Sequence, residues 1–244
     1  MKSWITGLAP IVALAAVIAS SYSALGLRVG VGVLLAAIFG LGWPYYLGIP
    51  AKKTLGTIIA LAGTGSAVAA ALTEGPGFLV HVPIFIALGL GSVFVVQLVR
   101  GTGQVHRLES TLGAGAGVAM SALGSGWIAA HRFTGDGAMT LVTGAAALVA
   151  LLVGLIRWPD RVVTPLGLVL AALAGPLAAL LFSEIQVVPA AIVGLVVAAV
   201  VLAFRRLGTL AGAPRSVPGA LAMGVAPVAS LGALVYFVDK LLIT

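Results

Sequence analysis

The placement of charge constrains this chain more than any other feature of its sequence. All 13 Lys and Arg residues and all 6 Asp and Glu residues fall outside nine long stretches that carry no charge. About 20 apolar residues in an α-helix cross a hydrocarbon core of roughly 30 Å, so each stretch is long enough to span a membrane. These stretches cover residues 3–27, 29–51, 54–73, 75–99, 110–131, 137–156, 162–183, 185–204 and 216–238.

The composition points to lipid as the solvent. Hydrophobic residues make up 61% of the chain and charged residues 8%, and the mean hydropathy is +1.22. A soluble domain carries about 25% charged residues. Backbone groups in lipid must be satisfied within the segment, which favours helices. We therefore predict an all-α polytopic transmembrane helix bundle, a single domain over residues 1–244, with about nine spans near 4–23, 29–49, 54–73, 79–99, 110–130, 138–156, 162–182, 186–204 and 217–238.

The basic residues predict the orientation, because Lys and Arg accumulate in cytoplasmic loops. With a cytoplasmic N-terminus and an external C-terminus, only Arg28, Arg132 and Lys240 lie outside. The basic residues inside are then Lys2, Lys52, Lys53, Arg100, Arg107, Arg157, Arg161, Arg205, Arg206 and Arg215. The first stretch also has features of a cleavable signal peptide. We favour an uncleaved helix, because Arg28 and another span follow at once.

Aromatic residues gather toward the ends of the predicted spans, as expected of an interfacial belt. Tyr22, Trp127 and Tyr236 fall near the external ends. The other ends carry Trp4, Trp43, Tyr45, Tyr46 and Trp158.

Small residues and prolines predict how some helices pack. Glycines and serines are dense over residues 113–126, and small residues four apart let helices approach closely in lipid. The fifth span should therefore be central and tightly packed. Pro176 and Pro227 lie inside predicted helices and should kink them. The segments Gly7-Leu-Ala-Pro10 and Gly224-Val-Ala-Pro227 resemble each other, although so short a match in an Ala- and Gly-rich chain also arises by chance.

Motifs for catalysis are missing from the sequence. It contains no Cys, no zinc-protease motif and no P-loop, and only 6 carboxylates in all. We therefore expect no metal, no cofactor and no enzymatic activity. The net charge is +7, but basic residues in a membrane protein are first of all topology signals, so we expect membrane lipids rather than nucleic acid as partners.

Polar residues of the predicted outer face form the best candidate binding site. The candidates for substrate binding are His81, His131, Arg132 and Glu184, with Glu74 and Asp136 nearby in the sequence. They suggest a recognition patch for an anionic or lipid-headgroup ligand. The alternative is that they are ordinary residues of water-facing loops.

Four short segments resemble small polytopic permease-like integral membrane proteins of high-GC Gram-positive bacteria. The segments are Gly7-Leu-Ala-Pro10, residues 21–26, Gly42-Trp43-Pro44 and Glu109-Ser110. The resemblance implies a multi-pass protein of the bacterial inner membrane with a presumed transport role. It implies no functional residue.

Three functional hypotheses follow. The first is a permease-like protein that handles a small neutral or lipid-like substrate. The second is a non-transporting assembly or scaffold subunit of a cell-envelope complex, with a membrane-protein partner or as a homo-oligomer. The third is a lipid-modifying enzyme with a site at the outer face.

Overall fold

The computed structural model describes residues 3–75, 77–101, 106–156, 158–183 and 185–242. Every regular element in these ranges is a helix, which confirms the all-α prediction. The helices are α1 Ser3–Ser21, α2 Leu25–Leu47, α3 Lys52–Leu72, α4 Val82–Val99, α5 Arg107–Leu123, α6 Gly126–Thr134, α7 Ala138–Gly154, α8 Asp160–Phe182, α9 Val187–Ala211 and α10 Val217–Leu242.

Eight of the predicted spans are long and apolar enough to cross a membrane. One of these eight, Arg107–Thr134, contains both α5 and α6. The remaining predicted span corresponds to α7, an apolar helix of 17 residues. At 1.5 Å per residue α7 is about 25 Å long, slightly less than the roughly 30 Å of a hydrocarbon core. The chain is therefore a polytopic membrane protein by helix length and composition.

The fifth predicted span differs from expectation because its helix is interrupted. α5 ends at Leu123 and α6 begins at Gly126, with Gly124 and Ser125 between them. The Ser125 hydroxyl donates a 2.7 Å hydrogen bond to the carbonyl oxygen of Ala122. The interruption lies where α6 meets α10, so the small residues serve close helix contact there.

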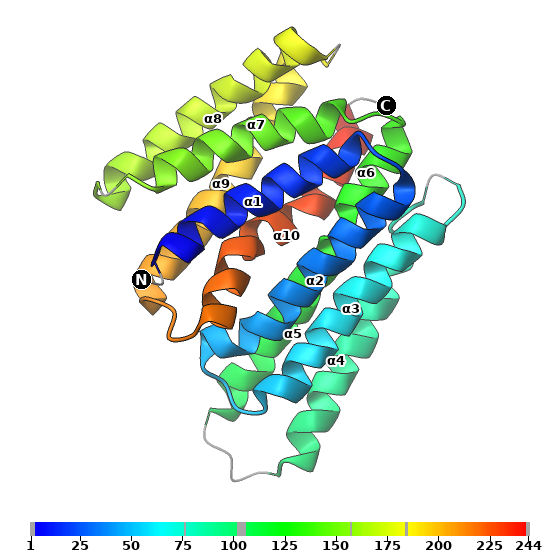
Figure 1. Ribbon diagram of the computed structural model, residues 1–244, viewed down its shortest axis with the longest axis vertical. Coiled ribbons are helices and arrows are strands. Elements are labelled where there is room, and N and C mark those ends of the chain that lie inside the picture. Colours follow the sequence, from blue (N-terminus) through cyan, green and yellow to red (C-terminus); the bar gives the residue numbers. More distant parts are fainter. Residues whose placement is uncertain (1–2, 76, 102–105, 157, 184, 243–244) are drawn as a thin grey trace.

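Helix ends alternate between two sides of the molecule (Figure 1). One side, which we call the N-terminal face, holds the start of α1 and the ends of α2, α4, α7 and α9. The opposite side, the C-terminal face, holds the ends of α1, α3, α6, α8 and α10. This alternation is the arrangement expected of helices that cross the same layer in turn.

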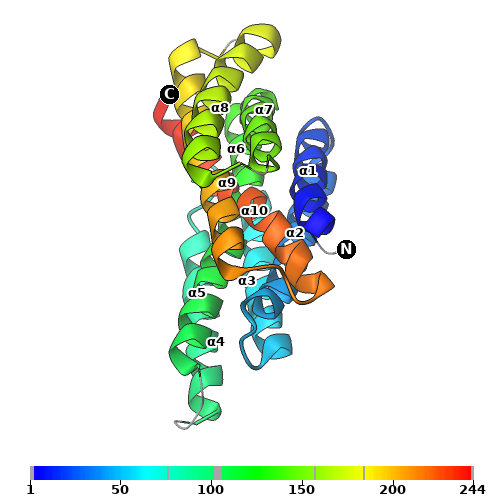
Figure 2. The ribbon, with the colours of Figure 1, turned by 90° about the vertical axis from the view of Figure 1, so that its left-hand side faces the viewer.

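Helix α10 is the centre of the bundle. It packs against α1, α2, α5, α6, α7 and α9, and it is the most buried of the candidate spans. Helices α2 to α5 form a group on one side of α10, and α7 to α9 form a second group on the other (Figures 1 and 2). The expectation that the fifth span packs closely is met, since α5 contacts α2, α3, α4 and α10.

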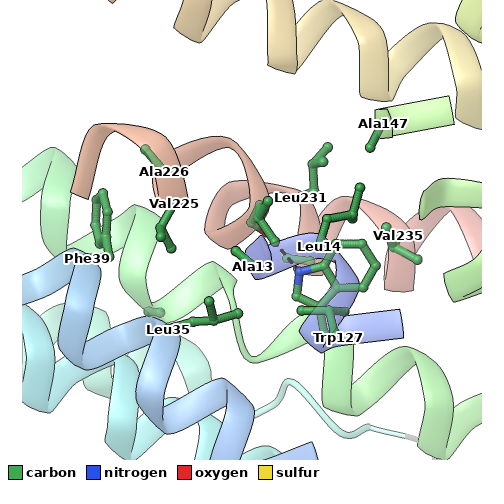
Figure 3. Close-up of a cluster of buried hydrophobic side chains, with 14 of the residues drawn as sticks. Ala13, Leu14, Leu35, Phe39, Trp127, Ala147, Val225, Ala226, Leu231 and Val235 are labelled. Atoms are coloured by element: carbon green, nitrogen blue, oxygen red, sulfur yellow. Dashed lines mark hydrogen bonds between the residues drawn. The ribbon is translucent and has the colours of Figure 1, made fainter. Parts of the chain in front are cut away.

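The core joins these groups through side chains from α1, α2, α6 and α10. Figure 3 shows Leu14, Leu35, Trp127 and Leu231 within one buried cluster. The Trp127 indole nitrogen donates a 2.8 Å hydrogen bond to the carbonyl oxygen of Val228 across the α6–α10 contact. This bond satisfies a buried polar group that lipid would leave unpaired.

The aromatic residues divide into two groups that the sequence did not distinguish. Trp4, Tyr22 and Trp158 are more than half exposed, as an interfacial belt requires. Trp43, Trp127 and Tyr236 are instead buried among helices. For these three the belt interpretation was wrong, because they contribute to the core.

Candidate functional site

The predicted outer patch lies at the C-terminal face, and its members have separate environments. His81 is exposed in the turn before α4, and Pro83 is the second residue of that helix. His131 lies half-buried on α6, and its Nδ1 atom is buried without a hydrogen-bond partner. Glu184 lies outside the described residues. A binding role for these residues stays a prediction.

Arg132 is held by the backbone of α3. Its guanidinium donates hydrogen bonds of 2.9, 2.8 and 2.7 Å to the carbonyl oxygens of Ala70, Ala71 and Thr73. It also lies over the ring of Phe78, 4.6 Å from the centroid. The last carbonyls of a helix lack partners within the helix, so this arginine caps the C-terminus of α3. All three bonds come from one Nη atom of the guanidinium, so that nitrogen serves α3.

A larger site lies at the opposite end of the bundle. A cavity of about 1030 Å³ opens at the N-terminal face between α1, α7, α9 and α10. The size is at the upper end of the roughly 300–1,000 Å³ range of small-molecule pockets. The cavity extends along α9 from Gly212 to Val201, which is about 16 Å of helix or half of the hydrocarbon core.

The four helices enclose the cavity because they contact one another in a ring. α1 packs on α7, α7 on α9, α9 on α10, and α10 on α1. The lining is mainly apolar and includes Leu8, Leu151, Leu155 and Phe204. The remaining lining residues include Trp4 and Trp158, which are exposed. A long apolar chain could therefore lie within this lining.

The deep part of the cavity is lined by two prolines from the similar segments noted in the sequence. Pro10 of α1 and Pro227 of α10 both line it. The helices cross there at Gly224, where a Cβ atom would lie 2.7 Å from the Cβ of Ala9 and 3.2 Å from the Cδ of Pro10. A proline leaves the carbonyl four residues earlier without its helical amide, here those of Thr6 and Met223. Both of those residues also line the cavity.

Few polar side chains face the cavity. The Tyr46 hydroxyl is buried and has no hydrogen-bond partner. Asp160 and Arg205 also line the cavity and form an ion pair with each other. Thr6 and Thr209 complete the polar lining. Among the described residues of this lining the charges balance, which favours a ligand that is neutral overall over one with a large net charge.

Arg205 also joins α9 to the end of α7. Its Nε donates a 2.8 Å hydrogen bond to the carbonyl oxygen of Gly154, and an Nη atom donates 3.3 Å and 3.4 Å bonds to the carbonyls of Ile156 and Trp158. With the bond to Asp160, the guanidinium holds the α7–α8 connection against α9. This arrangement forms one wall of the cavity mouth.

Sequence reasoning missed two features, one at each end of the bundle. The first is the cavity, for which the paired Gly-x-x-Pro segments were the available signal. The second is Asp239, which follows the last uncharged stretch and precedes Lys240. That position resembles an ordinary interfacial residue, but the side chain is fully buried. Within the described parts of the chain, no group of three or more His, Asp or Glu residues could hold a metal ion.

Comparison of the chain with known protein families, with curated proteins and with solved structures finds no match.

Proposed function

We propose that this protein is permease-like and that the cavity between α1, α7, α9 and α10 receives a small neutral or lipid-like amphipathic molecule. The observation that carries the proposal is the cavity of about 1030 Å³, apolar in most of its lining and open at the N-terminal face. Such a shape accommodates an acyl or isoprenoid chain together with a small polar group.

The position of the polar groups supports an amphipathic ligand. The Asp160–Arg205 pair is partly exposed, with Asp160 at the start of α8, whereas Val201 lines the cavity one turn deeper along α9 than Arg205. A ligand with its polar group at the mouth and its apolar part inside would match this gradient. The Tyr46 hydroxyl could form a hydrogen bond with such a ligand, since it has none within the protein.

The orientation belongs to the same proposal. The N-terminal face carries Lys52, Lys53, Arg161, Arg205 and Arg206, among other basic residues. Under the positive-inside rule this face is cytoplasmic, so the cavity opens toward the cytoplasm of the bacterial inner membrane. A substrate would then enter or leave on the cytoplasmic side.

Binding can be tested with a photoreactive lipid. The protein is reconstituted in nanodiscs with diacylglycerol that carries a diazirine in one acyl chain, and labelled peptides are identified by mass spectrometry. We expect labels on cavity residues such as Leu151 and Phe204, in addition to the lipid-facing helices. Leu151→Trp should fill the cavity and reduce those labels. Leu152→Trp is the matched control, because Leu152 is half exposed and does not line the cavity.

Transport needs its own measurement. Proteoliposomes loaded with a fluorescent diacylglycerol on one leaflet report its movement to the other leaflet. The proposal expects faster movement with the wild-type protein than with Leu151→Trp, and wild-type rates for Leu152→Trp. If the wild-type rate equals that of protein-free vesicles while cavity labelling persists, the site binds lipid but the permease assignment is wrong for this lipid class.

A further inference from the structure

Asp239 is a buried carboxylate near the C-terminal face, on the opposite side of the bundle from the cavity. Its relative exposure is 0%, and neither Oδ1 nor Oδ2 has a hydrogen-bond partner. It follows Tyr236 by one turn of α10, and the Tyr236 ring packs edge-on against Phe133 of α6 at 5.9 Å between centroids. At this end of the bundle α10 therefore packs against α6.

An ionised carboxylate in this position would be very unfavourable. Moving an unpaired charge from water into a site without hydrogen-bond partners costs far more free energy than a single protein interaction returns. Such groups become neutral instead. Ionisable residues inside membrane spans are rare and usually mark ion or proton pathways. Asp239 therefore needs a positively charged ligand that neutralises it.

The ligand that fits is a proton and not a metal ion. A hard cation such as Ca²⁺ takes six or more oxygen ligands, several of them carboxylates. The described residues provide no cluster of three metal-ligating side chains around Asp239. A proton needs only one carboxylate oxygen, and it converts the other into an ordinary hydrogen-bond acceptor.

The charged and titratable neighbours at this end come from several elements that pack on α10. The negative charge of Asp136, in the α6–α7 turn, acts on the carboxyl group of Asp239. The charges of Asp136 and Arg28 act on the imidazole of His131. The described ends of α5, α7 and α9 carry no titratable side chain here. Among the described residues of the elements that pack on α10, these neighbours are Tyr22 after α1, Arg28 of α2, His131 and Arg132 of α6, Asp136, and Tyr236 and Lys240 of α10 itself.

Asp136 is a carboxylate at this end of the bundle that is in contact with water. It is exposed, and its Oδ1 accepts a 3.0 Å hydrogen bond from the backbone amide of Ala138 at the start of α7. The negative charge of Asp136 disfavours a second negative charge on Asp239, because like charges in proximity cannot both ionise cheaply. An exposed carboxylate beside a buried one is also a means of passing protons to and from the aqueous phase.

We propose that Asp239 is a proton-binding site, which exchanges its proton with water at the C-terminal face past Asp136. The site is separate from the cavity at the N-terminal face and does not depend on the proposed function. If the protein is a permease, Asp239 is the group through which proton binding would influence it.

The test is labelling of the full-length protein in nanodiscs with dicyclohexylcarbodiimide, an apolar reagent that reacts with protonated carboxylic acids inside membranes. The acid transfers its proton to a carbodiimide nitrogen, and its oxygen bonds to the central carbon. We expect a stable adduct at Asp239, found by mass spectrometry, that diminishes as the pH rises. Asp239→Asn should lose it. Asp160→Asn, at the opposite face, should retain it.

Two further results would overturn the proposal. A water-soluble carbodiimide that labels Asp239 as readily as Asp136 would show that the carboxylate is hydrated. The infrared difference spectrum of wild type minus Asp239→Asn should contain the carbonyl band of a protonated carboxylic acid. Absence of that band over the whole pH range in which the protein is folded would mean that Asp239 is ionised, even if the reagent fails to reach it.

Discussion

Gly126 of α6 and Gly232 of α10 contact each other backbone to backbone. A Cβ atom on Gly126 would overlap the carbonyl carbon of Gly232, and a Cβ atom on Gly232 would lie 2.8 Å from the carbonyl oxygen of Leu123. Helices approach this closely in lipid only where side chains are absent. This contact fixes the central helix against the interruption between α5 and α6.

Replacement of Gly126 by Ala should therefore destabilise the bundle. Forcing extra atoms into a packed contact costs about 1–3 kcal/mol, and here the obstructing atoms are backbone, which cannot rotate away. The apparent melting temperature in detergent should fall. Gly91→Ala is the matched control, because a Cβ there meets nothing within 4 Å. Equal melting temperatures for both variants would contradict the α6–α10 contact.

Arg132 was predicted as a binding residue, and its three bonds to α3 predict a structural effect. Arg132→Gln should lower the melting temperature, because hydrogen bonds to a charged group contribute about 1.5–3 kcal/mol each. Arg132→Lys should restore only part of the loss, since a compact ammonium lacks the planar guanidinium that stacks on the ring of Phe78. Arg161→Gln, an exposed arginine, is the control. A stable Arg132→Gln protein would favour the original binding interpretation.

Arg205 should control the mouth of the cavity. Arg205→Gln removes the ion pair with Asp160 and the bonds to the α7–α8 connection. We expect a stability loss nearer about 1 kcal/mol than 3, because Asp160 is partly exposed and solvent screens the pair. Photolabelling within the cavity should become less specific. Arg206→Gln alters the neighbouring exposed arginine and should change neither result.

The orientation can be tested in intact cells, since the chain contains no Cys. A membrane-impermeant maleimide should label Tyr22→Cys, in the exposed turn after α1, but not Lys53→Cys at the start of α3. Lysis should make Lys53→Cys reactive, which shows that the residue is accessible. The reverse pattern in intact cells would invert the proposed topology and place the cavity mouth outside.

The sequence by itself determined that lipid surrounds most of the chain, that its regular elements are helices, and approximately where each span begins and ends. These properties are local: a stretch such as residues 54–73 is helical in lipid whatever it packs against, and α3 occupies Lys52–Leu72. Charges such as Lys53 must stay near the surface, which determined where the connections lie. The approximate positions of the helices were therefore readable from hydropathy and charge alone.

The tertiary structure decided which helices meet, and with them the functional features. A residue buried in protein and one exposed to lipid are equally apolar, so hydropathy cannot distinguish Trp127 in the core from Trp158 at the surface. Likewise Asp239 follows a span as an interfacial residue would, and only the packing of other helices on α10 removes it from water. The cavity exists because α1, from the start of the chain, joins α7, α9 and α10 in a ring, and that pairing depends on contacts between side chains that no single segment contains.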